Sequence, residues 1–366
     1  MKTSFDAVKK ALDKRIVDRY IAGAACKVTL NGKEVFDYCE GYADIEACRK
    51  LDHESTYRLA SMTKPFTGII TALMRERGLL SYDDEVCKYI PAFADVHVGK
   101  DGEKLKRNIT IRDCMTHSSG IGQDEATAWC MNAYQTEQPN LQHIVEGYSH
   151  TNTAFQPGTR TNYSPIAAPD VAARICEIVS GKSFGQLIAE EICGPLGMTN
   201  TTFEPTDEQW SRICEVYMPD TLRKMKIGRH TFSGDMPPYD CGGAGLVSTM
   251  DDYVKLSLML LGEGEYNGKR ILSRASCAEM RRPQLAADTE GLGLDMNWGI
   301  LMRTMTLTNE NQHLPIGCFG WSGAWGTHFW VDLANGLTAV LMMGGNCGGA
   351  GSPVARDIER AVYAEE

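Results

Sequence analysis

The sequence predicts a mixed α/β fold of the α+β kind, in which an antiparallel sheet from both chain ends is flanked by helices and joined to a helical region. Residues 26–44 place Asn31-Gly32 between β-prone runs, a strong hairpin signal because both central residues of a type I′ turn need positive φ. Residues 327–343 contain a second pair of β-prone runs around residues 333–336. The sequence between these hairpins is mostly helical in pattern.

The length of 366 residues exceeds what one hydrophobic core usually supports, so either two domains or one large α/β body with a sizeable insertion is expected. Because the hairpins lie near the chain ends, residues 1–61 and 236–366 are predicted to form an α/β sheet domain. Residues 62–235 are predicted to form a mainly helical domain inserted into it.

Helices are also predicted at both chain ends. Apolar residues recur at helical spacing over residues 4–21, behind a capping Ser4 and as far as Tyr20. A closing helix is expected after Pro353. These two helices would flank the predicted sheet.

Two further helices are predicted within the inserted region. One spans residues 170–179 and is expected to end at Gly181. Ser183 and Gln186 form a capping box that opens another, which is expected to end at Gly194.

Composition and charge exclude several classes of function. The formal charge of −10 would repel phosphate backbones, so nucleic acid is not an expected partner. The N-terminal residues are polar, and no stretch reaches 18 apolar residues, so a cytoplasmic protein without a membrane partner is expected.

The 13 cysteines include no CxxC pair, and the histidines form no HExxH. Reduced, mostly buried thiols are therefore expected, with no metal and no cofactor.

One short motif carries chemistry. Ser61-Met62-Thr63-Lys64 is the sole SxxK in the chain, and it begins an apolar stripe typical of a helix, with Pro65 in the first turn. Residues three apart on a helix lie about 5–6 Å apart between Cβ atoms, so Lys64 can reach the Ser61 hydroxyl. A lysine acts as a base at neutral pH when burial or a nearby cation lowers its pKa. The alternative interpretation is a helix-capping Ser61 beside a solvated Lys64.

Six segments of the chain are informative when taken together. In chain order they are YRLASMTKPFTG (57–68), ITIRDCMTHSSGIG (109–122), PGTRTNYS (157–164), GPLGMTNTTF (194–203), GGAGLVSTMDDY (242–253) and GWSGAWGTHFWVD (320–332). These segments resemble the class C β-lactamase-like superfamily of penicillin-recognising serine enzymes. Within it, the last segment is most similar to the β-lactamase-like esterases of the family VIII type, which place Trp where β-lactamases place Lys. The resemblance implies a serine β-lactamase/DD-peptidase-like fold with the active site in a cleft between sheet and helical region.

The second family motif, Tyr-[Ala/Ser]-Asn, corresponds to Tyr163-Ser164-Pro165. By resemblance Tyr163 shuttles the serine proton and passes it to the leaving group. Pro165 replaces the Asn whose amide contacts the substrate in β-lactamases, which weakens a β-lactam or peptide interpretation. Tyr148-Ser149 is a rival pair, but PGTR precedes only Tyr163.

The third family motif corresponds to Trp321-Ser322-Gly323. By resemblance the Ala324 N–H joins the Ser61 N–H as the oxyanion hole. Trp321 would offer only apolar surface in place of the cation that binds a substrate carboxylate. HSSG at 117–120 is expected to form a structured turn without a catalytic role. The predicted substrate-binding residues are Trp321, Ser322, Gly323 and Trp325.

The first functional hypothesis is a serine hydrolase that cleaves small carboxylic esters through an acyl-Ser61 intermediate, with Lys64 and Tyr163 moving protons. A β-lactamase or D-amino acid peptidase or amidase would use the same machinery on amide substrates. The remaining hypotheses are an acyltransferase and a catalytically inactive binding protein of the same fold. The sequence does not predict an oligomeric state.

Overall fold

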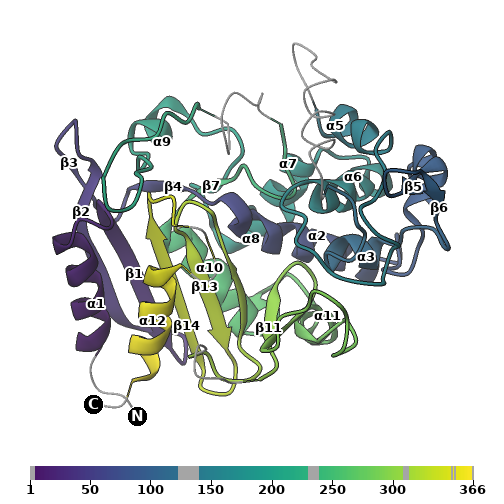
Figure 1. Cartoon of the computed structure of the whole chain (residues 1–366). Helices are drawn as coiled ribbons and strands as arrows, with labels where there is room; N and C mark the ends of the chain where they lie inside the picture. The colour runs from purple at the N-terminus through teal and green to yellow at the C-terminus, as the bar shows by residue number, and fades with distance from the viewer. Residues whose placement is uncertain are drawn as a thin grey trace.

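A computed structural model describes residues 5–122, 140–229, 239–307, 313–347, 349 and 352–364. Its centre is an eight-stranded antiparallel sheet with the strand order β10-β11-β12-β13-β14-β1-β2-β3 (Figure 1). The predicted fold class is confirmed. The strands are β1 (Gly23–Leu30), β2 (Lys33–Asp44), β3 (Arg49–Lys50), β10 (Met296–Trp298), β11 (Arg303–Met305), β12 (Phe319–Ser322), β13 (His328–Asp332) and β14 (Leu337–Met343).

Helices cover both faces of this sheet. Helices α1 (Asp6–Val17) and α12 (Pro353–Tyr363) lie side by side on one face, and α10 (Met250–Leu261) packs on the other (Figure 1). Side chains alternate accordingly: Trp330 joins the core under α1 and α12, whereas Phe329 and Val331 join the larger core on the opposite side.

The helical region lies beside the sheet, at the right of Figure 1. Its helix α2 (Lys64–Glu76) packs on α6 (Ala167–Ser180), and both helices contribute apolar side chains to the larger core. The other helices of the described residues are α3 (Ile111–Met115), α5 (Leu141–Tyr148), α7 (Phe184–Ile188), α8 (Gly194–Leu196), α9 (Asp207–Ser211) and α11 (Arg274–Arg281), with 3₁₀ turns at Ala60–Thr63, Val86–Lys88 and Pro91–Asp95 and a π-helical turn at Ala189–Cys193.

The described residues also form three short strand pairs outside the main sheet. Strand β4 (Thr56–Arg58), just before Ser61, pairs with β7 (Val247–Thr249), so the start of the SxxK motif is tied to a segment that is distant in the sequence. The remaining pairs are β5 (His97–Val98) with β6 (Glu103–Lys104) and β8 (Glu265–Tyr266) with β9 (Lys269–Arg270).

Both predicted hairpins are confirmed. Strands β1 and β2 turn at Asn31 (φ +50°) and Gly32 (φ +77°), as a type I′ turn requires, and β13 and β14 form the second hairpin. The helix after Pro353 is also confirmed as α12.

Two predicted helix ends are wrong. The opening helix stops at Val17, because Arg19 adopts the left-handed conformation (φ +59°), and Tyr20 therefore lies outside it. Ser4 lies outside the described residues. Gly194 keeps helical φ, and the chain continues to Gly197, whose φ of +66° makes it the helix-terminating glycine.

The helix predicted over residues 170–179 begins earlier, at Ala167, with Pro169 in its first turn, and Gly181 terminates it as predicted. The domain boundaries at 61/62 and 235/236 stay a proposal, and residue 235 lies outside the described residues. Every helix in the described ranges is too short or too polar to cross a lipid bilayer.

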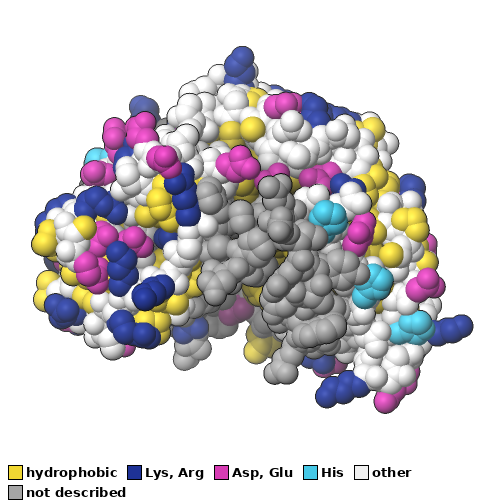
Figure 2. Space-filling model, turned by 90° about the horizontal axis from the view of Figure 1, so that it is seen from above, with side chains coloured by type: hydrophobic (Ala, Val, Ile, Leu, Met, Phe, Trp, Pro, Cys, Tyr) yellow, Lys and Arg dark blue, Asp and Glu magenta, His cyan; other side chains and the backbone are white. Residues whose placement is uncertain are grey.

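On the face of the molecule shown in Figure 2, cationic and acidic side chains are interspersed at the left of the view.

All twelve described cysteines are free thiols, and nine of them are buried, as predicted; Cys130 lies outside the described residues.

Candidate active site

Ser61 lies on a 3₁₀ turn (Ala60–Thr63) that leads directly into α2. The preceding residue, Ala60, has a φ of +47°, a left-handed conformation that costs a non-glycine residue about 1 kcal/mol. Hydrogen bonds from Leu59 N to Leu246 O (2.9 Å) and from Thr327 Oγ1 to Leu59 O (3.0 Å) hold this turn from two distant segments. The surrounding fold therefore imposes the strained backbone that presents Ser61.

The structure brings the three predicted catalytic side chains together. Lys64 Nζ donates to Ser61 Oγ at 3.1 Å, and Tyr163 Oη donates to the same oxygen at 2.8 Å. Lys64 Nζ also lies 4.9 Å from the centroid of the Tyr163 ring. The rival Tyr148 instead donates to Asp170 inside the helical region. The amine and the phenol thus both lie within proton-transfer distance of the serine hydroxyl.

Lys64 is completely buried, and backbone carbonyls satisfy it. Its Nζ donates to Pro165 O at 2.5 Å and to Gly243 O at 2.8 Å, in addition to Ser61 Oγ. A protonated amine has three N–H donors, and these three oxygens match that number. Pro165 therefore contributes through its carbonyl oxygen, a role that the comparison with the family's Asn did not predict.

Trp321 on β12 contributes more than the apolar surface predicted for it. Its indole Nε1–H donates to Tyr163 Oη at 3.2 Å, and its ring lies 5.3 Å from that of Tyr163 between centroids. A donor aimed at the phenol oxygen stabilises negative charge there. The indole reaches this oxygen because successive side chains of a strand point to opposite faces, and Trp321, like its partner Phe329 on β13, points to the face on which α10 packs.

His117 was missed as a site residue because its HSSG segment was interpreted as a turn alone. The turn exists, with φ of +55° at His117 and +77° at Gly120. However, the fully buried imidazole packs 4.7 Å from the Tyr163 ring, and its Nδ1 accepts from Ser164 N at 3.2 Å. Burial, with a smaller contribution from the Lys64 charge, places the pKa of His117 well below its usual value, so the ring is neutral.

Trp298 of β10, also missed, closes the other side of this aromatic cluster, 4.4 Å from His117 and 4.8 Å from Trp321 between ring centroids. In the sequence, Trp298 lies outside the segments that resemble the family, so only its aromatic residue type could have suggested a place in the site. Tyr163 is thus held by packed aromatic rings as well as by hydrogen bonds.

The predicted substrate-binding side chain of Ser322 points away from Ser61. It is buried on the α12 side of the sheet, where its hydroxyl lies 2.6 Å from His328 Nδ1. His328 Nε2 in turn lies 3.0 Å from Glu359 of α12, which also pairs with Arg303. Alternation along β12 explains the difference from the prediction, because Trp321 and Ser322 cannot face the same side.

Gly323 lies directly against the backbone before Ser61. A Cβ at this position would stand 2.2 Å from Leu59 O. The next residue, Ala324, is exposed, and Trp325 is buried against Ala60. Gly323 and Trp325 therefore border the turn that carries Ser61.

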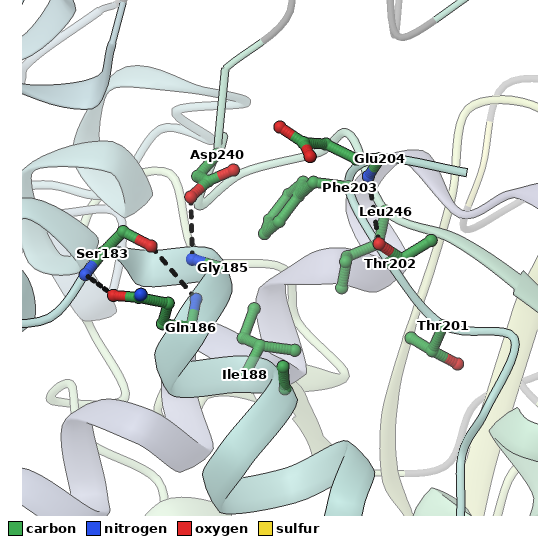
Figure 3. A pocket seen from close by; sticks show the side chains of 11 residues that line it. Ser183, Gly185, Gln186, Ile188, Thr201, Thr202, Phe203, Glu204, Asp240 and Leu246 are labelled. Atoms are coloured by element: carbon green, nitrogen blue, oxygen red, sulfur yellow. Dashed lines mark hydrogen bonds between the residues drawn. The ribbon is translucent and has the colours of Figure 1, made fainter. Parts of the chain in front are cut away.

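A cavity of about 270 Å³ lies between α7 and the segment around Phe203 (Figure 3). Leu246, whose carbonyl holds Leu59, forms part of its wall, and Asp240 accepts from Gly185 N at 2.8 Å. Burial raises the pKa of Asp240. The described lining contains none of the three catalytic side chains: it consists of Ser183, Gly185, Gln186, Ile188, Ala189, Thr201, Thr202, Phe203, Glu204, Asp240 and Leu246.

In the part of the chain that the structure describes, no three His, Cys, Asp or Glu side chains gather as a metal site would require. The described site offers hydroxyl, amine, phenol and indole groups, which are suited to proton transfer and covalent catalysis.

Comparison with known proteins places this geometry in a family. The sequence model of the Beta-lactamase family matches residues 8–363. This chain belongs to the Beta-lactamase family. Protein Rv1367c of Mycobacterium tuberculosis, a similar sequence, is 30% identical over 330 residues, which cover 83% of this chain and 80% of that protein.

Two other similar proteins carry functional names. Esterase EstB of Burkholderia gladioli is 24% identical over 386 residues, covering 96% of this Beta-lactamase family chain and 93% of the esterase. A solved structure described as "EstCE1, a hydrolase with promiscuous acyltransferase activity" superposes with a TM-score of 0.85 at 22% identity, covering 98% of both chains. The predicted fold and family resemblance are thus confirmed.

Proposed function

We propose that this protein is a serine hydrolase that cleaves small carboxylic esters through a covalent acyl-Ser61 intermediate. One observation carries the proposal: Ser61 Oγ receives hydrogen bonds from both Lys64 Nζ and Tyr163 Oη. A serine becomes nucleophilic when a neighbouring group can take its proton. The similarity to EstB, an esterase by name, supports ester substrates.

Tyr163 is the group best placed to move the proton. Tyr163 first loses its phenol proton to solvent, so that its oxygen accepts from the Ser61 hydroxyl instead of donating to it. The phenolate then takes the hydroxyl proton while Ser61 Oγ bonds to the ester carbonyl carbon and the C=O π electrons move to the carbonyl oxygen. Tyr163 returns this proton to the leaving alcohol as the C–O bond breaks, and the acyl group stays on Ser61. Water then attacks the acyl-serine along the same proton path, and the carboxylic acid leaves.

Lys64 and Trp321 would assist through charge. The two backbone carbonyls that accept from Lys64 suit its protonated form, and its charge lies near the Tyr163 ring. The Trp321 N–H points at the same phenol oxygen. Both groups therefore stabilise the phenolate that accepts the serine proton.

The oxyanion hole is proposed to consist of the N–H groups of Ser61 and Ala324. The approach of Gly323 to Leu59 supports this, because it brings the backbone after β12 against the turn that carries Ser61. Trp325, packed against Ala60, would border the acyl group. The expected cytoplasmic location stays a prediction.

Initial rates with p-nitrophenyl acetate and butyrate, beside the β-lactam nitrocefin, test this function. We expect turnover of the esters, loss of at least about 10⁴-fold in Ser61→Ala, and little turnover of nitrocefin. Faster turnover of nitrocefin than of both esters would instead support the β-lactamase hypothesis. Failure of Ser61 to react with a fluorophosphonate probe would support an inactive binding protein.

Acyl transfer is the second candidate, favoured by the structural likeness to EstCE1, whose description includes acyltransferase activity. An acyl-serine can be released by an alcohol as well as by water. Product analysis with p-nitrophenyl butyrate and increasing butanol separates the two: a transferase forms butyl butyrate in proportion to butanol, whereas a strict hydrolase forms butyric acid alone.

A further inference from the structure

Asp170 of α6 is a completely buried carboxylate. Its Oδ1 accepts from Gly242 N at 2.7 Å, and its Oδ2 accepts from Tyr239 Oη at 2.7 Å and from Tyr148 Oη at 3.3 Å. Within the described residues it forms no ion pair with Lys or Arg. Burying a carboxylate in this way is costly, and burial raises the pKa of Asp170 to about 6 despite these hydrogen bonds.

The backbone segment that donates a hydrogen bond to Asp170 also accepts one from Lys64. Gly242 donates its N–H to Asp170, and the next residue, Gly243, accepts from Lys64 Nζ with its carbonyl at 2.8 Å. Thr67, one helical turn after Lys64, donates to Gly242 O at 2.6 Å. The glycine pair is thus fixed from α6 on one side and from α2 on the other.

Close packing leaves this glycine pair little freedom. A Cβ on Gly243 would stand 2.5 Å from Pro165 O, the second carbonyl that accepts from Lys64. A Cβ on Gly242 would stand 2.7 Å from Pro169 O in the first turn of α6. Both carbonyl acceptors of Lys64 therefore belong to one packed unit that includes the start of α6.

We propose that Asp170 is a positioning residue for Lys64: by holding Gly242 N–H it sets the place of the Gly243 carbonyl and so of the lysine amine beside Ser61. This inference rests on the proposed serine chemistry. It gives a role to a buried carboxylate that lies one hydrogen bond away from the backbone around Lys64. Asp170 does not touch Ser61, Tyr163 or substrate in this role.

Two substitutions at position 170 separate positioning from a structural role. Asp170→Asn keeps an oxygen acceptor for Gly242 N–H, whereas Asp170→Leu has a similar size and no acceptor. We expect Asp170→Leu to lower kcat for p-nitrophenyl acetate about 100-fold with KM within about twofold, the effect of a misplaced catalytic group. We expect Asp170→Asn to retain kcat within about fivefold. Asp170→Ser, whose hydroxyl is too short to reach Gly242, is the second test should the Leu variant not fold.

Asp252 provides a matched control. It is a buried carboxylate on α10 that accepts from Asn200 N at 2.7 Å and pairs with Lys255 at 3.0 Å, and none of the three catalytic side chains contacts it. Asp252→Leu is expected to lower thermal stability and leave kcat at 25 °C within about twofold. Equal losses of kcat in Asp252→Leu and Asp170→Leu would show that both act through general destabilisation, and would overturn the proposal.

A second readout does not depend on turnover. The ε-carbon resonance of Lys64 in ¹³C-labelled protein, assigned by its absence in Lys64→Met, reports the surroundings of the amine. We expect it to shift in Asp170→Leu and Asp170→Ser but not in Asp170→Asn. An unchanged resonance or an unchanged kcat in a folded Leu or Ser variant overturns the positioning role. An inactive wild-type protein whose Lys64 resonance still shifts would count against ester hydrolysis and not against Asp170.

Discussion

Removing the indole donor of Trp321 tests whether the phenol oxygen of Tyr163 carries negative charge during catalysis. The substitution Trp321→Phe keeps an aromatic ring and deletes the N–H that donates to Tyr163 Oη at 3.2 Å. A hydrogen bond to a charged group contributes about 1.5–3 kcal/mol. Because about 1.4 kcal/mol corresponds to a tenfold change in rate, kcat should fall about 10- to 150-fold. KM should change little, since the lost bond matters most when the phenolate forms.

Trp330→Phe is the matched control. Trp330 is fully buried under α12, and its Nε1–H donates to Tyr363 Oη at 3.1 Å, on the face of the sheet opposite to the serine. Like Trp321→Phe, this variant loses one indole hydrogen bond to a tyrosine oxygen and the same volume of aromatic ring. It should therefore melt at a lower temperature than wild type and keep its kcat at 25 °C. The assay is steady-state hydrolysis of p-nitrophenyl acetate with folding checked by circular dichroism. A kcat for Trp321→Phe within twofold of wild type would refute the reasoning.

Three further predictions concern the surroundings of the site. Gly323→Ala should reduce kcat at least about 100-fold, because its Cβ would stand 2.2 Å from Leu59 O and displace the turn of Ser61; unchanged ester turnover would contradict this. Burial depresses the pKa of His117 in the folded protein, so near pH 6.5 the unfolded chain binds a proton at this residue and the folded chain does not. Lowering the pH from 6.5 to 5.5 should therefore reduce the free energy of unfolding by about 1 kcal/mol. Denaturant titrations should show a shallower slope with pH in His117→Gln; equal slopes would exclude His117 as the cause. Glu359→Ala leaves Arg303 buried without its partner and should cost about 3–5 kcal/mol in urea unfolding; a loss below about 1 kcal/mol would mean that the pair is easily replaced.

The parts of this protein that could be predicted from its sequence depend on short-range geometry. The hairpin at Asn31-Gly32 follows from the positive φ that two successive residues need. The pairing of Ser61 with Lys64 follows from the three-residue spacing in a helical turn. Tyr163 lies 102 residues from Ser61, and only the resemblance to a known family linked the two.

Side-chain direction on a strand shows where such reasoning fails. Trp321, Ser322 and Gly323 formed one predicted substrate-binding group because together they match the third motif of the family that the sequence resembles. In the sheet, the Ser322 hydroxyl turns to His328 on the α12 side while the Trp321 indole turns to Tyr163. The alternation itself was predictable, but which face carries the site depends on what packs there, and that is a property of the whole fold.

The catalytic lysine shows why local reasoning predicts the residues and not their chemistry. Ser61 is three residues from Lys64, but the other two acceptors of the amine lie 101 and 179 residues away, at Pro165 and Gly243. A solvated lysine on a first helical turn would be the ordinary outcome for an isolated SxxK. Here two distant backbone segments replace its water shell with carbonyl oxygens and bury it completely. The motif supplies the functional groups, and the long-range packing of α2 on α6 and on the glycine pair gives the amine a fixed place beside the serine.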